Sequence, residues 1–289
     1  MAAAEAPRQA DAAPAAPTFT GPAAAGEPIT EAEAIERLRQ TADPSQQYYG
    51  AWWLGRMRSG HPEAVPLLRL ALRQRRPREP GDGVEENAVA RNAARAMGKL
   101  APAALAAIPD LLATLEDGDD GLREAAARAL GELRAPAAVG PLCRRLASGL
   151  AGAGAPQTGS PRLQEPCEAM LEALGEIGCA TREVLQVVEP FLGHERPLIR
   201  SAAARSLLQL SGDARWAAVL LELLEHPQLQ VRRAALMDLG GAGWRPALGA
   251  IERTLAENSL KLIALRGLVE QGRGEPGEEA LLACMDTLL

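Results

Sequence analysis

The sequence predicts an all-α protein, built as a curved α-solenoid of stacked helix pairs, and three observations support this. Apolar residues make up 47% of the 289 residues but aromatic residues only 3%, so the apolar content is mostly Ala and Leu. This composition offers few of the β-branched and aromatic residues that strands prefer. A short helical phrase also recurs along the chain, and each copy follows a second helical stretch. Because such a unit cannot bury its own apolar face, neighbouring units must stack.

The recurring phrase is Arg, two variable residues, Ala-Ala, one variable residue and Ala-Leu-Gly. Its clearest copy is LREAAARALGEL, Leu122–Leu133. In that copy the apolar residues follow helical spacing, so Glu124, Ala125, Arg128 and Glu132 are expected to face a groove. The remaining copies are Gln47–Met57 (altered), Ala90–Leu100, Cys167–Ile177, Ile199–Leu210, Val231–Gly240 and Ser259–Leu268 (degenerate).

The final Gly of the phrase gives the length of the repeat. It or its equivalent falls at Gly55, Gly98, Gly131, Gly175, Leu208 and Gly240. The intervals of 43, 33, 44, 33 and 32 residues indicate one unit length with two insertions. The Pro, Gly and charged residues near 76–86 and 150–163 predict that the insertions are loops there.

A proline recurs in the first helix of several pairs, which is typical of HEAT-type repeats. These prolines are Pro66, Pro109, Pro141 and Pro190. About six helix pairs are therefore expected to stack over residues 28–289 into a right-handed superhelix, with the Ala-Leu-Gly helices lining its concave side. Residues 1–27 are rich in Ala and Pro and have little bulky apolar content, which predicts a disordered tail.

Composition also excludes several classes of function. The formal charge of −6 argues against binding to nucleic acid or to an anionic membrane. No apolar run is long enough to predict a membrane span. The four cysteines have neither disulfide-framework nor zinc-ligand spacing, so we expect reduced thiols, no metal and a cytoplasmic protein. Catalytic motifs are absent, and Cys167, which takes the Arg position of its repeat, is the one cysteine with a candidate role.

The first copy departs from the repeat because it is aromatic. Aligning Gly55 with Gly131 places Tyr48, Tyr49 and Trp52 at groove positions and Trp53 in the core. An exposed aromatic cluster in a groove is typical of a ligand or partner site. The alternative is a capping repeat, in which these rings pack against a first helix at Glu31–Arg39.

The next copy places Arg91, Asn92, Arg95 and Lys99 at the corresponding groove positions. The fourth copy places Glu168, Ala169, Glu172 and Glu176 there, so the groove runs from aromatic through basic to acidic. This order fits a flat aromatic ligand whose carboxylates are held by Arg91 and Arg95, because the planar guanidinium matches a carboxylate. The alternative is an ordinary solvated face of charged residues.

Three stretches resemble the E subunit of the E/F-type phycobilin lyases, a family of HEAT-repeat proteins. The most specific is Tyr48–Gly55, YYGAWWLG, which matches the family's aromatic signature near the N-terminus. The other two are Arg91–Leu100 and Glu257–Leu268. The likeness covers roughly residues 28–270, with the tail outside the family pattern.

The resemblance implies a bilin lyase subunit that acts with a related F-type subunit in phycobilisome biogenesis. Phycocyanobilin would be its substrate and no cofactor would be permanently bound. The lyase would promote thioether formation with a cysteine of the phycocyanin alpha subunit, chiefly by orienting the bilin. Tyr48, Tyr49, Trp52, Arg91 and Arg95 would bind the bilin, and no catalytic acid or base is assigned. The alternative is a non-catalytic HEAT-repeat scaffold or chaperone for phycobiliprotein assembly.

The chain ends in an apolar stretch, whereas a solenoid normally caps both ends with polar faces. Four side chains in this stretch are predicted to contact the F-type subunit. They are Leu281, Leu282, Met285 and Leu288.

Overall fold

The computed structural model describes residues 29–77, 87–271 and 277–289. Within these ranges the chain is helical apart from its connections, and extended pairing is limited to an isolated bridge between Pro156 and Leu163. The expected tail at 1–27 and most of the 76–86 insertion lie outside the described residues. Glu31–Leu289 forms one compact unit.

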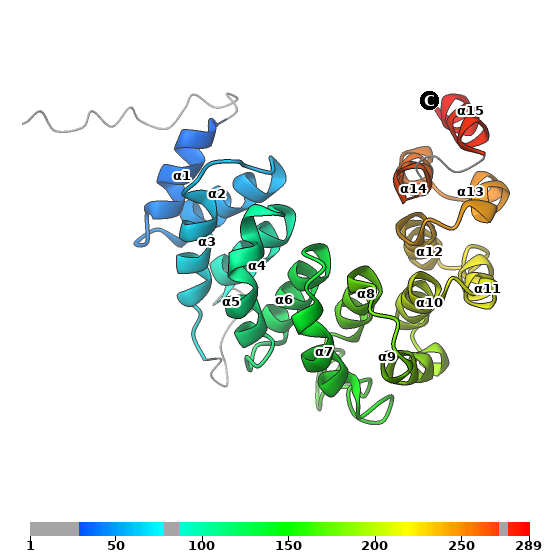
Figure 1. Cartoon of the computed structure of the whole chain (residues 1–289), viewed down its shortest axis with the longest axis horizontal. Helices are drawn as coiled ribbons and strands as arrows, with labels where there is room; N and C mark the ends of the chain where they lie inside the picture. Colours follow the sequence, from blue (N-terminus) through cyan, green and yellow to red (C-terminus); the bar gives the residue numbers. More distant parts are fainter. Residues whose placement is uncertain (1–28, 78–86, 272–276) are drawn as a thin grey trace, which may run out of the picture. The chain divides into compact units, whose positions relative to one another are not determined.

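The seven copies of the recurring phrase form seven helices, each of which contacts the next along the chain. Figure 1 shows them stacked in sequence order. They are α2 (Pro44–Arg56), α4 (Ala88–Lys99), α6 (Asp120–Glu132), α8 (Cys167–Ile177), α10 (Pro197–Ser211), α12 (Leu229–Ala242) and α14 (Asn258–Gln271).

The first helix of each pair precedes its recurring helix in the chain. These helices are α1 (Glu31–Arg39), α3 (Ala64–Arg73), α5 (Ile108–Thr114), α7 (Val139–Leu146), α9 (Arg182–Val188), α11 (Ala214–Leu223) and α13 (Leu248–Arg253). A final helix, α15 (Glu278–Leu288), packs on α14.

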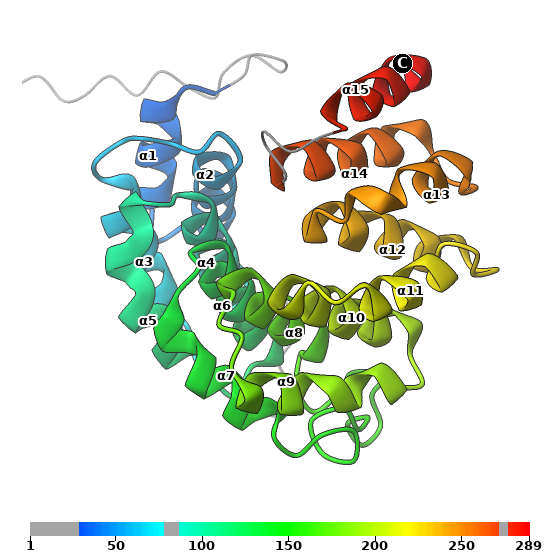
Figure 2. The same cartoon turned by 45° about the vertical axis from the view of Figure 1, so that its right-hand side comes forward.

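Two rows of helices result within the unit. Figure 2 shows α4 to α12 of the recurring row on the inner side of the bend, with α5 to α11 outside. The expected all-α solenoid, with the recurring helices on the concave side, is confirmed. Seven pairs are present among the described residues, one more than the count of about six. In the part of the chain that the structure describes, no helix combines the length and apolar character needed to cross a bilayer.

The recurring prolines Pro66, Pro109, Pro141 and Pro190 each lie in the first turn of a helical segment. A 3₁₀ segment precedes α5, α7 and α13 and another follows α9. Pro109 occupies the first turn of α5, and Pro190 the first turn of the 3₁₀ segment after α9. Proline lacks the N–H of an interior helical bond but fits a first turn, which explains these positions.

The core consists largely of Ala and Leu from the recurring helices. In α6, Leu122, Ala126, Ala129 and Leu130 are buried, as the periodicity predicts. Ala125 was expected to face the groove, but it is fully buried. The reason is that α6 is covered by α4 on one side and α8 on the other, which leaves a narrower exposed stripe.

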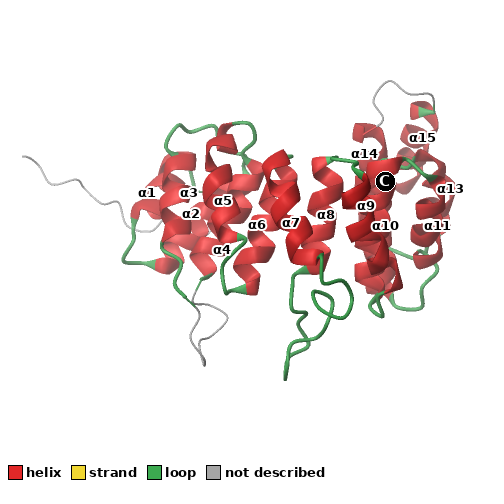
Figure 3. Cartoon of the chain, turned by 60° about the horizontal axis from the view of Figure 1, so that its bottom comes forward, coloured by secondary structure: helices red, strands yellow, loops and turns green. Residues whose placement is uncertain are grey.

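The second insertion connects α7 to α8 and is an irregular loop, residues 147–166. It extends beyond the helix ends in Figure 3. The buried Arg123 fixes the end of this loop, because its Nε donates to Glu165 at 2.9 Å and its Nη2 donates to the Gln164 carbonyl at 3.0 Å. The loop is therefore tied to α6, beside the inner surface.

Candidate functional site

The aromatic residues of α2 form an exposed cluster. The side chains of Tyr48, Tyr49 and Trp52 are 42%, 39% and 44% exposed. The rings of Tyr49 and Trp52 stack, with centroids 5.5 Å apart, and the Arg37 guanidinium lies over Tyr49 at 5.1 Å. This packing orders the rings while leaving much of their surface open.

The start of α2 sets which residues face outward. Asp43 caps the helix by accepting hydrogen bonds from the backbone N–H groups of Ser45 and Gln46, at 3.0 and 3.2 Å. Trp53 was expected in the core, but it is only half-buried. The buried face of α2 is centred on Ala51 and Leu54, and Trp53 lies at the edge of that face.

The two predicted arginines of α4 differ in their surroundings. Arg91 is mostly buried and forms an ion pair with Asp119, at 3.2 Å. Arg95 is exposed. Asn92, also expected in the groove, is buried and donates to the Tyr48 carbonyl oxygen at 2.8 Å. The amide of Asn92 thus ties α4 to the aromatic cluster.

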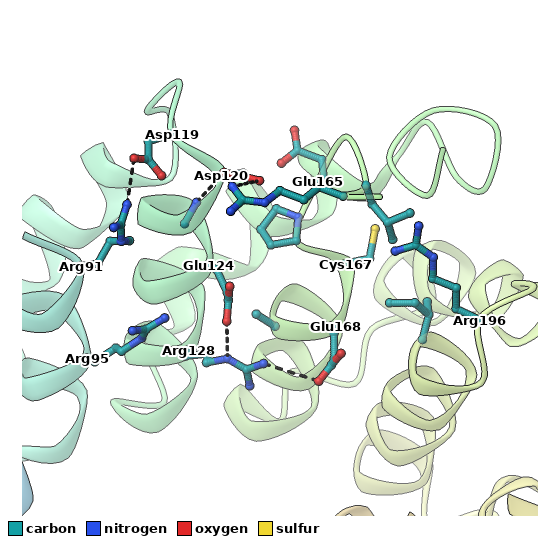
Figure 4. A pocket seen from close by; sticks show the side chains of 16 residues that line it. Arg91, Arg95, Asp119, Asp120, Glu124, Arg128, Glu165, Cys167, Glu168 and Arg196 are labelled. Atoms are coloured by element: carbon teal, nitrogen blue, oxygen red, sulfur yellow. Dashed lines mark hydrogen bonds and ion pairs between the residues drawn. The ribbon is translucent and has the colours of Figure 1, made fainter. Parts of the chain in front are cut away.

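A cavity of about 450 Å³ lies beside Arg91 and Arg95, between α4, α6, the 147–166 loop and the starts of α8 and α10. Figure 4 shows its charged lining. The lining residues that carry charge are Arg91, Arg95, Asp119, Asp120, Glu124, Arg128, Arg162, Glu165, Glu168 and Arg196. The structure therefore brings Arg91 and Arg95 to one wall, whereas Tyr48, Tyr49 and Trp52 lie outside the cavity, on the adjacent helix.

Arg128, which lines this cavity, stands at the centre of an ion-pair cluster. It contacts Glu124 at 3.3 Å and Glu168 at 3.6 Å, and also bonds Glu172. Burial raises the pKa of Glu168, and the neighbouring Glu172 carboxylate raises it further. One guanidinium faces three carboxyl groups here, so the cluster ties α6 to α8 and offers no free cation.

Cys167 lines the cavity but is poorly suited to act as a nucleophile. Its side chain is buried, and its thiol donates to the Ala153 carbonyl oxygen at 3.3 Å. Burial raises the pKa of this thiol to about 12. Because the thiolate is the reactive form, Cys167 stays protonated and unreactive near neutral pH.

Sequence reasoning missed Arg162 and Arg196, which also line the cavity. Arg162 lies in the second insertion and Arg196 in the connection that precedes α10. Both are outside the recurring phrase, so alignment of the repeats gave them no position, and the only signal was the insertion for Arg162. The described residues also contain no cluster of three or more His, Cys, Asp or Glu that could hold a metal ion.

The C-terminal helix presents part of its apolar surface. Leu282 is 46% exposed, and Met285 and Leu288 are partly exposed. Leu281 is buried, because it belongs to the face by which α15 packs on the rest of the unit. The exposed part of the predicted interface is thus formed by three of its four residues.

Comparison with known protein families identifies repeats between residues 46 and 240. Residues 84–151 and 166–240 match HEAT repeats, and residues 46–74 match the PBS lyase HEAT-like repeat. The last of these matches contains the aromatic cluster.

Characterised relatives are similar over almost their whole length. The bilin biosynthesis protein RpcE of Synechococcus sp. is 49% identical, over 91% of this chain and 96% of the relative. The phycocyanobilin lyase subunit alpha of Picosynechococcus sp. is 44% identical, over 89% and 95%. A chain in the solved complex of CpcE and CpcF of phycocyanin lyase from Nostoc sp. is 39% identical, with a TM-score of 0.82 over 96% of this chain and all of that chain.

Proposed function

The chain belongs to the family of phycocyanobilin lyase alpha subunits, and we propose that it binds phycocyanobilin on its inner surface and promotes its attachment to phycocyanin. It acts with an F-type subunit, and the acceptor is a cysteine of the phycocyanin alpha subunit. The main observation that supports this binding site is the exposed aromatic cluster of α2, which lies next to the arginines of α4. A bilin is a conjugated tetrapyrrole with two propionates. This surface offers aromatic rings that can stack on the tetrapyrrole and arginines that can bind the propionates.

The reaction is an addition, so atoms balance without a redox partner. The acceptor thiol adds across the ethylidene double bond of the bilin. A carbon–sulfur bond forms, and the thiol proton ends on the adjacent ring carbon. The chain's contribution is to hold one conformer of the bilin and present one face to the thiol.

Each part of the proposed site has a distinct role. Tyr48, Tyr49 and Trp52 contact the pyrrole rings through the aromatic surface that their own packing leaves exposed. Because that packing already orders the rings, binding costs little further side-chain entropy. Arg91 and Arg95 form the wall that meets a propionate. Arg95 donates directly, and the ion pair with Asp119 keeps Arg91 oriented beside it.

The F-type subunit is proposed to cover the exposed face of α15. Leu282, Met285 and Leu288 provide the contact, and the buried Leu281 supports them from within. The similarity to a chain of the solved complex of CpcE and CpcF supports a two-subunit enzyme. We place this enzyme in the cytoplasm, where its four thiols remain reduced.

Co-expression tests the function. The chain, an F-type subunit, the phycocyanin alpha subunit and a source of phycocyanobilin are produced together, and each is omitted in turn. The expected result is zinc-fluorescent alpha subunit after denaturing electrophoresis only when both lyase subunits are present. Equal labelling without this chain would contradict the proposal, and a role limited to stabilising the acceptor would instead raise its yield without raising labelling per molecule.

A further inference from the structure

The 450 Å³ cavity is lined by five arginines and five acidic residues, so its formal charge is zero, but these charges are not all paired with one another. Of its five arginines, three pair with acids of the same lining. These pairs are Arg91 with Asp119, Arg128 with Glu124 and Glu168, and Arg162 with Asp120. The remaining acid, Glu165, is engaged by Arg123 and Arg145 from outside the lining, each at 2.9 Å.

Two lining arginines therefore have no carboxylate partner in the described part of the chain. Arg95 projects from α4, and Arg196 precedes the first residue of α10. Figure 4 shows them on opposite sides of the cavity. Between them lie the beginnings of α8 and α10, neither of which has a side-chain cap, so their backbone N–H groups add positive potential.

Arg196 is held in place by the second insertion. Its Nη2 donates to the Pro161 carbonyl oxygen at 2.6 Å, and its backbone N–H donates to His194 Nδ1 at 2.9 Å. The other ring nitrogen of the buried His194 bonds the Gly154 carbonyl oxygen at 3.0 Å. With Nδ1 accepting, Nε2 carries the proton that is donated to Gly154. The loop thus positions Arg196 while leaving its other guanidinium N–H groups for a ligand.

We propose that Arg95 and Arg196 form a two-sided clamp for the two propionates of the bilin, one on each wall of this cavity. This inference rests on the proposed function and adds to it a residue outside the repeat pattern. The propionates belong to the two central rings of a bilin, so they leave the same edge of the pigment. A cavity with one unmatched cation on each side fits that arrangement, while the rings extend toward Trp52.

A larger cavity, of about 740 Å³, is less suited to carboxylates. It lies at the C-terminal ends of the inner helices and includes Arg58, Lys99, Arg134 and Arg205. Helix C-termini carry negative potential, which favours such cations and disfavours an anion. Arg205 is moreover already paired with Glu176, at 2.7 Å.

The test compares phycocyanobilin with its dimethyl ester, whose propionates are uncharged. Both pigments are titrated into the purified complex with the F-type subunit, and binding is followed by visible absorbance. Wild type is expected to prefer the free acid. Arg95→Ala and Arg196→Ala should each weaken free-acid binding roughly 10-fold and leave ester binding unchanged, since a charge-assisted bond is lost. The double variant should bind both pigments alike, and Arg196→Lys should retain part of the preference.

Arg73→Ala is the matched control, because Arg73 lies on the outer helix α3 and its partner Asp110 keeps a second ion pair with Arg69. Each variant is checked by its melting temperature. A folded Arg196→Ala complex with the wild-type preference for the free acid would overturn the clamp and leave the proposed function intact. A wild-type complex that binds neither pigment would overturn both.

Discussion

Gly98 of α4 lies directly against Ala129 of α6. A Cβ atom on Gly98 would sit 2.8 Å from the Cα of Ala129, closer than two carbon atoms can approach. The same relationship recurs along the inner row. The other pairs are Gly55 with Ala96, Gly131 with Ala173, Gly175 with Ser206 and Gly240 with Ala264. The glycine at the end of the repeat therefore sets the distance between successive inner helices, except between α10 and α12, where Leu208 takes its place.

Gly98→Ala is expected to lower the free energy of unfolding by about 1–3 kcal/mol, because the added methyl group forces α4 and α6 apart. This loss exceeds the roughly 1 kcal/mol that alanine gains over glycine in a helix. Chemical denaturation measures it. Gly118→Ala is the control, since a Cβ there would meet nothing within 4 Å. Equal stability of the two variants would show that Gly98 does not set the spacing.

Arg123 is expected to be the main anchor of the second insertion. Besides its bonds to the loop, its Nη1 donates to the carbonyl oxygens of Asp117 and Gly118. Arg123→Met leaves Glu165 half-paired and buried acceptors unsatisfied, which should cost about 3–5 kcal/mol. Limited proteolysis should also become faster within residues 147–166.

The comparison variant is Arg266→Met, whose arginine is largely exposed and pairs with Glu270 on the same helix. An exposed pair of this kind contributes under about 1 kcal/mol. If Arg123→Met is no less stable than Arg266→Met, the loop is held by other contacts.

Asp238 is expected to make stability depend on pH. Burial raises the pKa of its carboxyl group to about 6, although Arg205 and Ser201 favour the charged form. An unfolded aspartate has a pKa near 3.9. The folded protein therefore binds this proton more tightly, and the stabilisation is complete below pH ~4 and is lost as the pH rises through about 6.

The difference in the free energy of unfolding between wild type and Asp238→Asn, measured by chemical denaturation at each pH, isolates this effect, because the other carboxyl groups are common to both proteins. Wild type should lose stability relative to the variant as the pH rises from roughly 4 to 7, by on the order of 2 kcal/mol. A constant difference across that range would contradict the raised pKa.

Leu282→Glu is expected to weaken assembly with the F-type subunit without unfolding the chain, because a charge would then lie in an apolar interface. Co-purification through a tag on the partner, together with the melting temperature, provides the measurement. Leu105→Glu is the matched control, since Leu105 is 48% exposed but lies far from α15 in the sequence, before α5. Equal recovery of both variants with the partner would exclude Leu282 from the interface.

The architecture could be predicted from the sequence because each copy of the repeat shows the helical spacing of Ala, Leu and Gly that lets helices pack closely. A copy of the recurring phrase, exact or altered, lies in every inner helix, and the loop composition near residue 150 marks the second insertion. The number of pairs was underestimated because the degenerate copy, Ser259–Leu268, has no clear terminal glycine in register.

The site was harder to predict, since it depends on contacts between repeats. Helical periodicity placed Trp52 outward correctly, but it could not show that neighbouring helices cover Ala125 and Asn92. It also could not show that Trp53 lies at the edge of the buried face. Arg196 stood outside the repeat alignment, because its position depends on how a loop folds back onto α10.

Titration of the purified two-subunit complex with phycocyanobilin, comparing wild type with Trp52→Ala and Trp53→Ala, tests the central claim most directly. Trp52→Ala should weaken binding roughly tenfold or more through lost stacking, with an unchanged melting temperature. Trp53→Ala should lower the melting temperature and leave the affinity of the folded complex near that of wild type. Undiminished affinity in Trp52→Ala, or an exchange of the two outcomes, would contradict a bilin site on this face of α2.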